Sequence, residues 1–284
     1  MYIINYSTSG LGNRLRPLAS CFAAAQATGR KVLAYWDNIT PNGCLAKWDE
    51  LFENHLDIIS LEELKNLDDC ALYTEKPRPG QMCHGCEREW VKFGRDALKH
   101  LASKYPAQPT EHFRLHTRNK HIIVYENNFL VDTSITDAHN YLRSLRPIES
   151  IRKAVDYYAA TLNLNKNIYG IHARGTDSHS DLRNYIAQIE KCLREDSDRK
   201  FFISTEDPDF ESTIINKFPN NILYRRKKHY IVRTNPSNSW DDHNGFYITK
   251  EHAQEAIEDL YLLARTKIHI HSGSSFGELA RIIS

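Results

Sequence analysis

Long apolar runs are absent from the sequence. No stretch of its 284 residues approaches the roughly 20 apolar residues of a membrane span. The opening "MYIINYSTSG" lacks a basic segment followed by an apolar one, which a secretory leader would show. A charge excess is missing as well, because the formal net charge is +1 and offers no broad attraction to nucleic acid or acidic membranes. These absences predict a cytoplasmic protein with no membrane span and no nucleic-acid partner.

A disulfide pattern is also missing from the sequence. The six cysteines show no spacing typical of a disulfide framework. Cys83 and Cys86 form one CxxC in "MCHGCE", but this motif stands without the second pair that would indicate a zinc site. We therefore interpret this segment as a loop with two incidental thiols, and we expect no metal cofactor.

What the sequence does contain is an alternation of short apolar strands and helical stretches. Such alternation is typical of α/β architecture with parallel sheets, and the length suits two domains. We predict two Rossmann-like domains, 1–145 and 146–284, facing a central cleft at the carboxyl ends of their strands. The predicted strands are "YIINY", "KVLAYW", "HIIVYE", "NIYGIHA", "KFFIST", "NNILY" and "KIHIHS", and the predicted helices are 15–27, 146–164, 182–195, 209–218 and 250–265.

A glycine-rich stretch, "SGLGNRL", follows the first strand. Glycines at such a turn let backbone N–H groups approach an anion or a sugar, and Asn13 and Arg14 would lie at the edge of the cleft. Leu15 stands where the dinucleotide fingerprint requires its third glycine. The stretch, with Gly10 and Gly12, is therefore either a ligand loop or a tight turn between strand and helix.

The strongest local pattern is "HARGTD", at the end of the predicted strand 167–173. Arg174 can grip a phosphate with a planar fork of donors, and His172 can donate to a phosphate or to a base. The alternative is a structural salt bridge between Arg174 and Asp177. We favour an anion-binding corner.

Two further strand ends carry polar side chains. In "FFISTEDPDF", Asp207 followed by proline predicts a helix N-cap, and Asp209 in the first helical turn needs no metal to be stable there. In "KIHIHSGSSFGELA", Ser274 and Ser275 would lie at a helix N-terminus, where phosphate is favoured. The helix before that strand has an apolar stripe, and its periodicity predicts Asp259 on the solvated face.

Taken in order, these segments resemble the GT-B fucosyltransferases that use GDP-fucose. The α1,2-, α1,6- and protein O-fucosyltransferases and the bacterial nodulation-factor enzyme are of this kind. "HARGTD" is similar to the first motif of the family, "STEDP" to the second, and "IEDLYLLARTKIHIHSGSSFGELA" to the third, while "GLGNRL" is similar to its opening loop. The resemblance covers both ends of the chain and most of 168–284, but little of 40–145.

The resemblance implies a metal-independent, inverting transfer of L-fucose from GDP-fucose to an oligosaccharide or glycoconjugate. It implies that Arg174 holds the β-phosphate, that His172 lies beside the nucleotide and that Asp259 accepts from guanine N1 and N2. Ser274 and Ser275 would hold the diphosphate. We also expect Asp207 among the donor-binding residues. The C-terminal domain would bind the donor, and the N-terminal domain would face the acceptor.

The general base stays open. Some α1,6 relatives carry a glutamate eight residues after the motif arginine, but that position here is Leu182, with Asp181 just before it. Asp177, Asp181 and Glu206 are all candidates for taking the proton of the acceptor hydroxyl.

Two other functions remain possible on these residues. The same phosphate corner would serve a GT-B transferase that uses another nucleotide sugar. A non-catalytic glycan- or nucleotide-binding protein on the same scaffold would bind without turnover. The basic run 224–233 could reach an anionic acceptor, although such a run is more often a solvated surface.

Overall fold

The computed structural model divides the chain into two compact units, Met1–Arg146 and Pro147–Ser284. It describes residues 1–7, 10–36, 46–74, 96–115, 120–126, 128–173, 181–230, 249–271 and 274–284. Arg174, Asp177, Cys83 and Cys86 lie outside these residues. The α/β architecture with parallel sheets is confirmed, because each unit holds one sheet whose strand pairs all run parallel.

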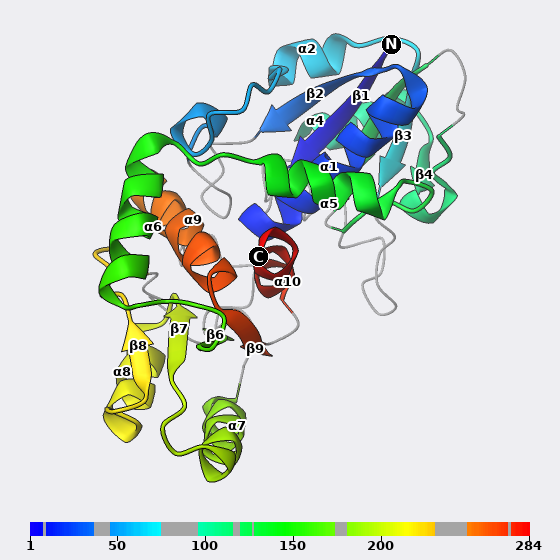
Figure 1. Cartoon of the computed structure of the whole chain (residues 1–284). Helices are drawn as coiled ribbons and strands as arrows, with labels where there is room; N and C mark the ends of the chain where they lie inside the picture. Colours follow the sequence, from blue (N-terminus) through cyan, green and yellow to red (C-terminus); the bar gives the residue numbers. More distant parts are fainter. Residues whose placement is uncertain are drawn as a thin grey trace. The chain divides into compact units, whose positions relative to one another are not determined.

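The first unit is built on a five-stranded sheet of order β2-β1-β5-β3-β4 (Figure 1). Its strands are β1 (Tyr2–Ser7), β2 (Lys31–Trp36), β3 (Cys70–Thr74), β4 (Ala107–Pro109) and β5 (His121–Tyr125). Helices α1 (Leu11–Thr28) and α5 (Ile135–Ser144) pack against each other, while α2 (Leu61–Asn66) and α4 (Asp96–Lys104) contribute Leu64 and Leu101 to a core with alternate strand residues. Alternation along the strands therefore gives this sheet two buried faces.

The second unit is built on a four-stranded sheet of order β8-β7-β6-β9. Its strands are β6 (Tyr169–Ala173), β7 (Phe201–Thr205), β8 (Ile222–Tyr224) and β9 (Lys267–His271). Helices α7 (Leu182–Glu195) and α8 (Pro208–Lys217) cover the face that carries Ile171 and Ile203. Helix α9 (Lys250–Ala264) contacts β6, β7 and β9 and is flanked by α6 (Glu149–Thr161) and α10 (Ser275–Ile283).

Gly170 shows how closely α9 and β9 approach strand β6. A Cβ at this position would lie 2.3 Å from Thr266 Oγ1 and 3.3 Å from Leu263 Cδ2. Residues 170, 172, 202 and 204 share the face opposite Ile171 and Ile203, since side chains alternate along a strand. His172 and Ser204 therefore belong to the face that α9 covers.

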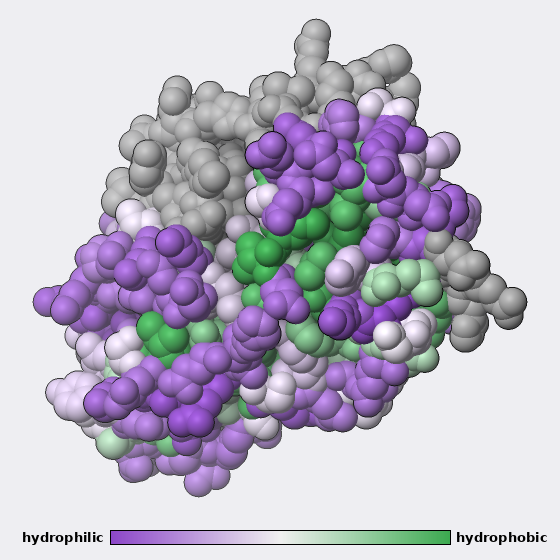
Figure 2. Space-filling view, turned by 90° about the horizontal axis from the view of Figure 1, so that it is seen from above, coloured by the Kyte–Doolittle hydropathy of each residue, from purple (hydrophilic) through white to green (hydrophobic). Residues whose placement is uncertain are grey.

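The hydrophobic residues are used mainly inside the two units. Hydrophilic residues predominate on the face shown in Figure 2, with hydrophobic residues visible as patches between them. In the part of the chain that the structure describes, no helix is both long and apolar enough to cross a membrane. The cytoplasmic location stays a prediction.

Candidate functional site

The carboxyl end of the second sheet gathers buried polar side chains. His172 is near the end of β6, Ser204 and Thr205 end β7, and Ser274 precedes α10. All four are buried. In an open parallel sheet this edge is where ligands bind, so the strand ends define the candidate site.

His172 and Ser274 form one half of the site. Nδ1 of His172 lies 2.9 Å from Oγ of Ser274, and the imidazole stacks on Phe276 with ring centroids 4.8 Å apart. Ser274 Oγ also accepts from the backbone N–H of Gly277, which makes Ser274 the N-cap of α10. The imidazole ring is thereby fixed at a helix N-terminus, a position that favours anions.

Asp259 is the centre of the other half. Its Oδ1 accepts from Nε and Nη2 of Arg225 at 3.2 and 2.7 Å. Its Oδ2 accepts from Oγ of Ser204 at 2.9 Å and lies 2.6 Å from Nζ of Lys227. These four donors fill the four acceptor directions of a carboxylate.

The solvated position predicted for Asp259 is wrong, because the residue is only 2% exposed. A single apolar stripe describes a helix with one packed face, but α9 packs on the sheet, on α6 and on α10. Asp259 reaches the sheet where Ser204 leaves room for a polar partner. The serine in "KFFIST" therefore favours a hydrogen-bond acceptor at the facing position of α9, which is Asp259.

Arg225 contacts three residues of helix α9. Besides Asp259 it pairs with Glu258 through Nη1 at 2.7 Å and donates from Nη2 to the carbonyl oxygen of Glu255. Its side chain is 3% exposed. The solvated-surface interpretation of the basic run is thus wrong for Arg225 and for Lys227, whose ammonium also donates to the carbonyl oxygen of Thr205 at 2.6 Å.

The electrostatics follow from this burial. Burial by itself opposes ionisation of Asp259, but Lys227 and Arg225 outweigh it and hold the pKa of the carboxyl below its ordinary value. Burial raises the pKa of Glu258 on the same helix, although Arg225 opposes that shift. The ionised Asp259 carboxylate is therefore the anchor of the cluster.

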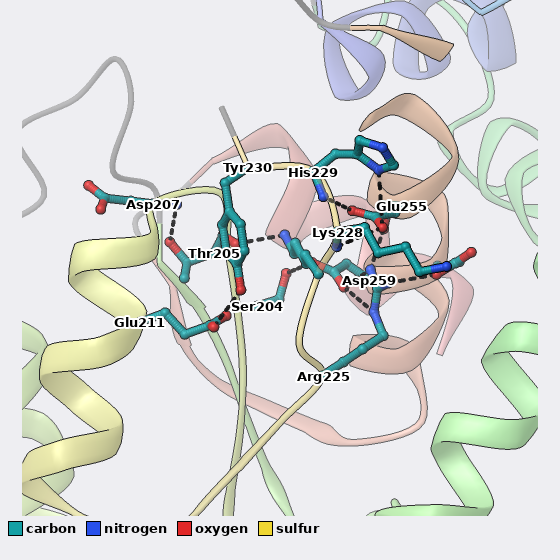
Figure 3. A network of polar contacts seen from close by, with 12 residues as sticks. Ser204, Thr205, Asp207, Glu211, Arg225, Lys228, His229, Tyr230, Glu255 and Asp259 are labelled. Atoms are coloured by element: carbon teal, nitrogen blue, oxygen red, sulfur yellow. Dashed lines mark hydrogen bonds and ion pairs between the residues drawn. The ribbon is translucent and has the colours of Figure 1, made fainter. Parts of the chain in front are cut away.

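An outer layer of contacts holds the segment after β8 (Figure 3). Glu255 accepts from the backbone N–H groups of Lys228 and His229, both at 3.1 Å. The Tyr230 hydroxyl donates to Glu211 at 2.6 Å. Burial of the hydroxyl raises the pKa of Tyr230 to about 12, and the Glu211 carboxylate adds to this shift. Residues 225–230 are thus fastened to both α8 and α9.

Two of the predicted carboxylates serve as helix caps. Asp207 accepts from the backbone N–H groups of Asp209 and Phe210, each at 3.0 Å, so its predicted N-cap role is confirmed. Asp181 caps α7 and forms an exposed bidentate pair with Arg183, whose hydrogen bonds lower the pKa of Asp181. Glu206 follows β7, and Ser275 is the first residue of α10.

The N-terminal motif takes a different form from the glycine-rich turn that its sequence predicts. Helix α1 already begins at Leu11, so Gly12, Asn13 and Arg14 lie in its first turn, and Gly10 is the N-cap. Among the residues that the structure describes, a Cβ at Gly10 would meet no atom within 4 Å. Arg14, predicted at the edge of a cleft, is fully buried, with its guanidinium over the ring of Trp36. Its long side chain and the aromatic ring stabilise each other inside the first unit.

Sequence reasoning missed most of the charged network. Ser204, Glu255 and Glu258 were not candidates, and Arg225 and Lys227 were considered only as part of the basic run 224–233. The alternation in "KFFIST" could have placed Ser204 on the buried face opposite Ile203. Nothing in the run "YRRKKHY" separates the buried Arg225 from the exposed Arg226.

Among the described residues, no group of three or more histidines, cysteines, aspartates and glutamates could hold a metal ion. The buried carboxylates of Asp259 and Glu258 already pair with Arg225, and Asp259 also pairs with Lys227. The predicted absence of a metal cofactor stays a prediction.

Comparison with known proteins gives structural matches only. No protein-family model matches the chain. No curated protein matches it by sequence.

The structural matches extend over nearly the whole chain. The α1,6-fucosyltransferase NodZ, co-crystallised with GDP, matches with a TM-score of 0.61 at 19% identity, over 99% of this chain and 91% of that chain. POFUT1 in complex with GDP-fucose matches with a TM-score of 0.52 at 14% identity, over 99% and 94%. A variant of Arabidopsis thaliana FUT1 in complex with GDP matches with a TM-score of 0.56 at 15% identity, over 99% and 68%. The chain therefore has a GT-B-like α/β fold of the kind found in fucosyltransferases solved with GDP or GDP-fucose.

Proposed function

We propose that the protein is an inverting glycosyltransferase that moves L-fucose from GDP-fucose to a hydroxyl of an oligosaccharide or glycoconjugate. The observation that carries this proposal is the structural match to fucosyltransferases over nearly the full length of both chains. The four sequence motifs that resemble that family support it independently. Fold alone does not determine function, so the site must supply the rest of the argument.

The second unit is the proposed donor domain. The N-terminus of α10, with Ser274 and Ser275, would bind the diphosphate through hydroxyl and backbone N–H donors. His172, ordered by Ser274, would lie beside the nucleotide. Asp259 would read the guanine base, with a guanine N–H taking the place on Oδ2 that the Ser204 hydroxyl now holds.

Arg174 and Asp207 complete the proposed donor set. Arg174 would hold the β-phosphate, where a guanidinium stabilises the charge that the leaving GDP gains. Asp207 would act by capping α8 and so shaping the end of β7, next to Ser204 and Thr205. No metal ion is required in this scheme, because an arginine and a helix N-terminus bear the charge of the leaving group.

The chemistry is an in-line displacement. The acceptor oxygen forms a bond to C1 of fucose while the bond from C1 to the β-phosphate oxygen breaks, and GDP leaves with the electron pair. The proton of the acceptor hydroxyl passes to a carboxylate. Asp181 suits this task least, because its pair with Arg183 lowers its pKa and leaves it a weak base. Asp177 and Glu206 are the preferred candidates.

The first unit is the proposed acceptor domain. Gly10 leaves open space beside the start of α1, and Asn13 lies one helical turn further on. An acceptor hydroxyl could be bound by backbone N–H groups there. Arg14 would act indirectly, through its packing on Trp36, and Gly12 through the tight first turn.

The experiment is a donor and acceptor screen that follows release of the nucleotide. The proposal expects GDP release from GDP-fucose, dependent on a glycan acceptor and exceeding the release from UDP- or ADP-linked sugars. Preference for another nucleotide sugar would replace the donor assignment. Binding of GDP without turnover across the acceptor panel would replace the enzyme with a binding protein.

A further inference from the structure

Lys227 and Asp259 form an adjacent donor and acceptor at the end of β7. Nζ of Lys227 lies 2.6 Å from Oδ2 of Asp259 and 2.6 Å from the carbonyl oxygen of Thr205. The two side chains are 9% and 3% exposed. An ammonium carries three N–H donors, and these two contacts use two of them. Within the described part of the chain, no third acceptor is recorded for this ammonium.

Arg225 differs from Lys227 in this respect. Its guanidinium is used on three sides, by Asp259, by Glu258 and by the carbonyl oxygen of Glu255. Lys227 is also the more mobile in principle, since it is a point charge on a flexible stem and Arg225 is a planar fork. The Lys227 side chain is 9% exposed and the Arg225 side chain 3%, so Lys227 is the cation on Asp259 whose remaining donor is more accessible to a ligand.

The spacing of this pair suits one particular base edge. Guanine presents its O6 acceptor directly beside its N1–H donor, with the N2 amine next in line. A carboxylate oxygen opposite N1–H requires its neighbouring partner, opposite O6, to be a donor at about the distance of one hydrogen bond. Asp259 Oδ2 and Lys227 Nζ meet that requirement.

We propose that Lys227 determines base specificity by donating a hydrogen bond to O6 of guanine while Oδ2 of Asp259 accepts from N1–H. This inference rests on the proposed function and deepens it at the same site. The Ser204 hydroxyl rotates freely and is the donor that gives up its place on Oδ2 when the base binds. Thr205 keeps its bond from Lys227, so the ammonium stays anchored at the end of β7.

Adenine fails at both positions of this pair. Its N6 amine would face the ammonium, and its N1 lone pair would face the carboxylate. Both groups are buried, so neither mismatch can be relieved by water, and a site built around hydrogen bonds rejects such analogues strongly. Discrimination against adenine therefore follows from two buried charges of opposite sign.

The test compares nucleotides that differ at single positions of the base. Dissociation constants are measured by calorimetry for GDP, 6-thio-GDP, IDP and ADP. 6-Thio-GDP keeps N1–H and the N2 amine but replaces O6 by a weak acceptor, whereas IDP keeps O6 and lacks the N2 amine. The proteins are the parent chain, Lys227→Met, and the matched control Lys228→Met, whose exposed side chain leaves its backbone bond to Glu255 intact.

The parent chain and the control should prefer GDP over 6-thio-GDP by about tenfold or more, as expected for a hydrogen bond to a charged donor. Lys227→Met should bind GDP about 10- to 100-fold more weakly and lose the preference over 6-thio-GDP. The ratio of its dissociation constants for GDP and IDP should match that of the parent, because both nucleotides keep O6 and N1–H. The preference for GDP over ADP should narrow.

Three outcomes overturn the inference. Equal binding of GDP and 6-thio-GDP by the parent chain overturns it without any variant. A uniform weakening of all four nucleotides in Lys227→Met would make the ammonium a structural or phosphate contact. A parent chain that binds none of the guanine nucleotides would remove the proposed function as well, so the two failures are distinguishable.

Discussion

The two units share a parallel α/β design but differ in what lies near the carboxyl ends of their strands. The first unit places aromatic rings there, with Tyr6 between Tyr35 and Tyr125 and Trp36 beside Trp48. The second unit places a buried network of Arg225, Lys227, Asp259 and their carboxylate neighbours. Aromatic packing tolerates changes of pH and salt, but a buried ionic network requires every member to keep its charge. The second unit thus buries a connected network of ion pairs, which costs desolvation free energy, whereas the first unit buries aromatic rings with the single guanidinium of Arg14 over Trp36.

The largest expected effect comes from removing one member of that network. Arg225→Met would leave Asp259 and Glu258 without their cation, and we expect a loss of about 3–5 kcal/mol in unfolding free energy. Urea titration should show the loss, and amide hydrogen exchange should place it in β7, β8 and α9 and not in the first unit. Arg226→Met, at an exposed neighbour, is the control and should stay within about 0.5 kcal/mol of the parent. A small effect of Arg225→Met would mean that the network does not stabilise the unit.

The glycines of the two units give a second contrast. Gly170→Ala would place a Cβ 2.3 Å from Thr266 Oγ1, and we expect a destabilisation of about 1–3 kcal/mol from overpacking. Gly10→Ala meets no atom of the described residues within 4 Å and has an ordinary φ of −62°, so only a modest loss at the helix cap is expected. Thermal unfolding measures both. If Gly10→Ala also abolishes transfer to the acceptor, the open space beside Gly10 belongs to a ligand.

Acidification should have the next largest effect, on the free energy of unfolding of the second unit. The pKa of Asp259 is lowered in the folded protein, so its contribution to stability is fully present above its unfolded value, about 3.9, and is lost as pH falls through the lower folded value. The parent chain should therefore lose stability on acidification more steeply than Asp259→Asn. Unfolding free energies measured between about pH 6 and pH 3 give the two slopes. Equal slopes would mean that the carboxylate is not held ionised by its neighbours.

Asp181 offers a smaller and sharper test. Asparagine is as good an N-cap as aspartate, so Asp181→Asn should lose only the exposed pair with Arg183 and leave the unfolding free energy nearly unchanged. Its kcat should stay near that of the parent, because Asp181 is a cap in this account. A fall of about 100-fold or more at unchanged stability would instead identify it as the general base.

Removal of metal ions is expected to leave the rate of fucose transfer unchanged. Fucose transfer should survive an excess of EDTA, because the proposed leaving-group charge is stabilised by Arg174 and by the N-terminus of α10. The measurement is the rate of GDP release before and after chelation. Loss of the rate with EDTA and its recovery with manganese or magnesium would require a metal site.

The sequence predicted the second unit more fully than the first. Strands β6, β7, β8 and β9 and helices α7, α8 and α9 lie within one or two residues of the predicted ranges, because apolar runs there end at clear turn residues. In the first unit β3, β4 and α5 were not predicted. β4 has only three residues and none of them is buried, so no apolar pattern marks it. β3 carries buried apolar residues and α5 an amphipathic pattern, and both signals were missed.

The candidate site was predicted in its positions but not in its partners. His172, Asp207 and Ser274 follow from strand ends and caps, which are local in sequence. The contacts of Asp259 with Ser204, Arg225 and Lys227 join residues 55, 34 and 32 positions apart, and only the packing of α9 on the sheet brings them together. Local patterns report the solvated or buried face of a helix, but they cannot report a second neighbour across it.

The most direct test of the central claim is the stereochemistry of the product. The protein is incubated with GDP-fucose and a panel of glycan acceptors, and the anomeric proton of the transferred sugar is observed by NMR. The account predicts acceptor-dependent GDP release and an α-fucoside formed from the β-linked donor. A β-fucoside, or an intact donor in the presence of every acceptor while GDP binds normally, would contradict it.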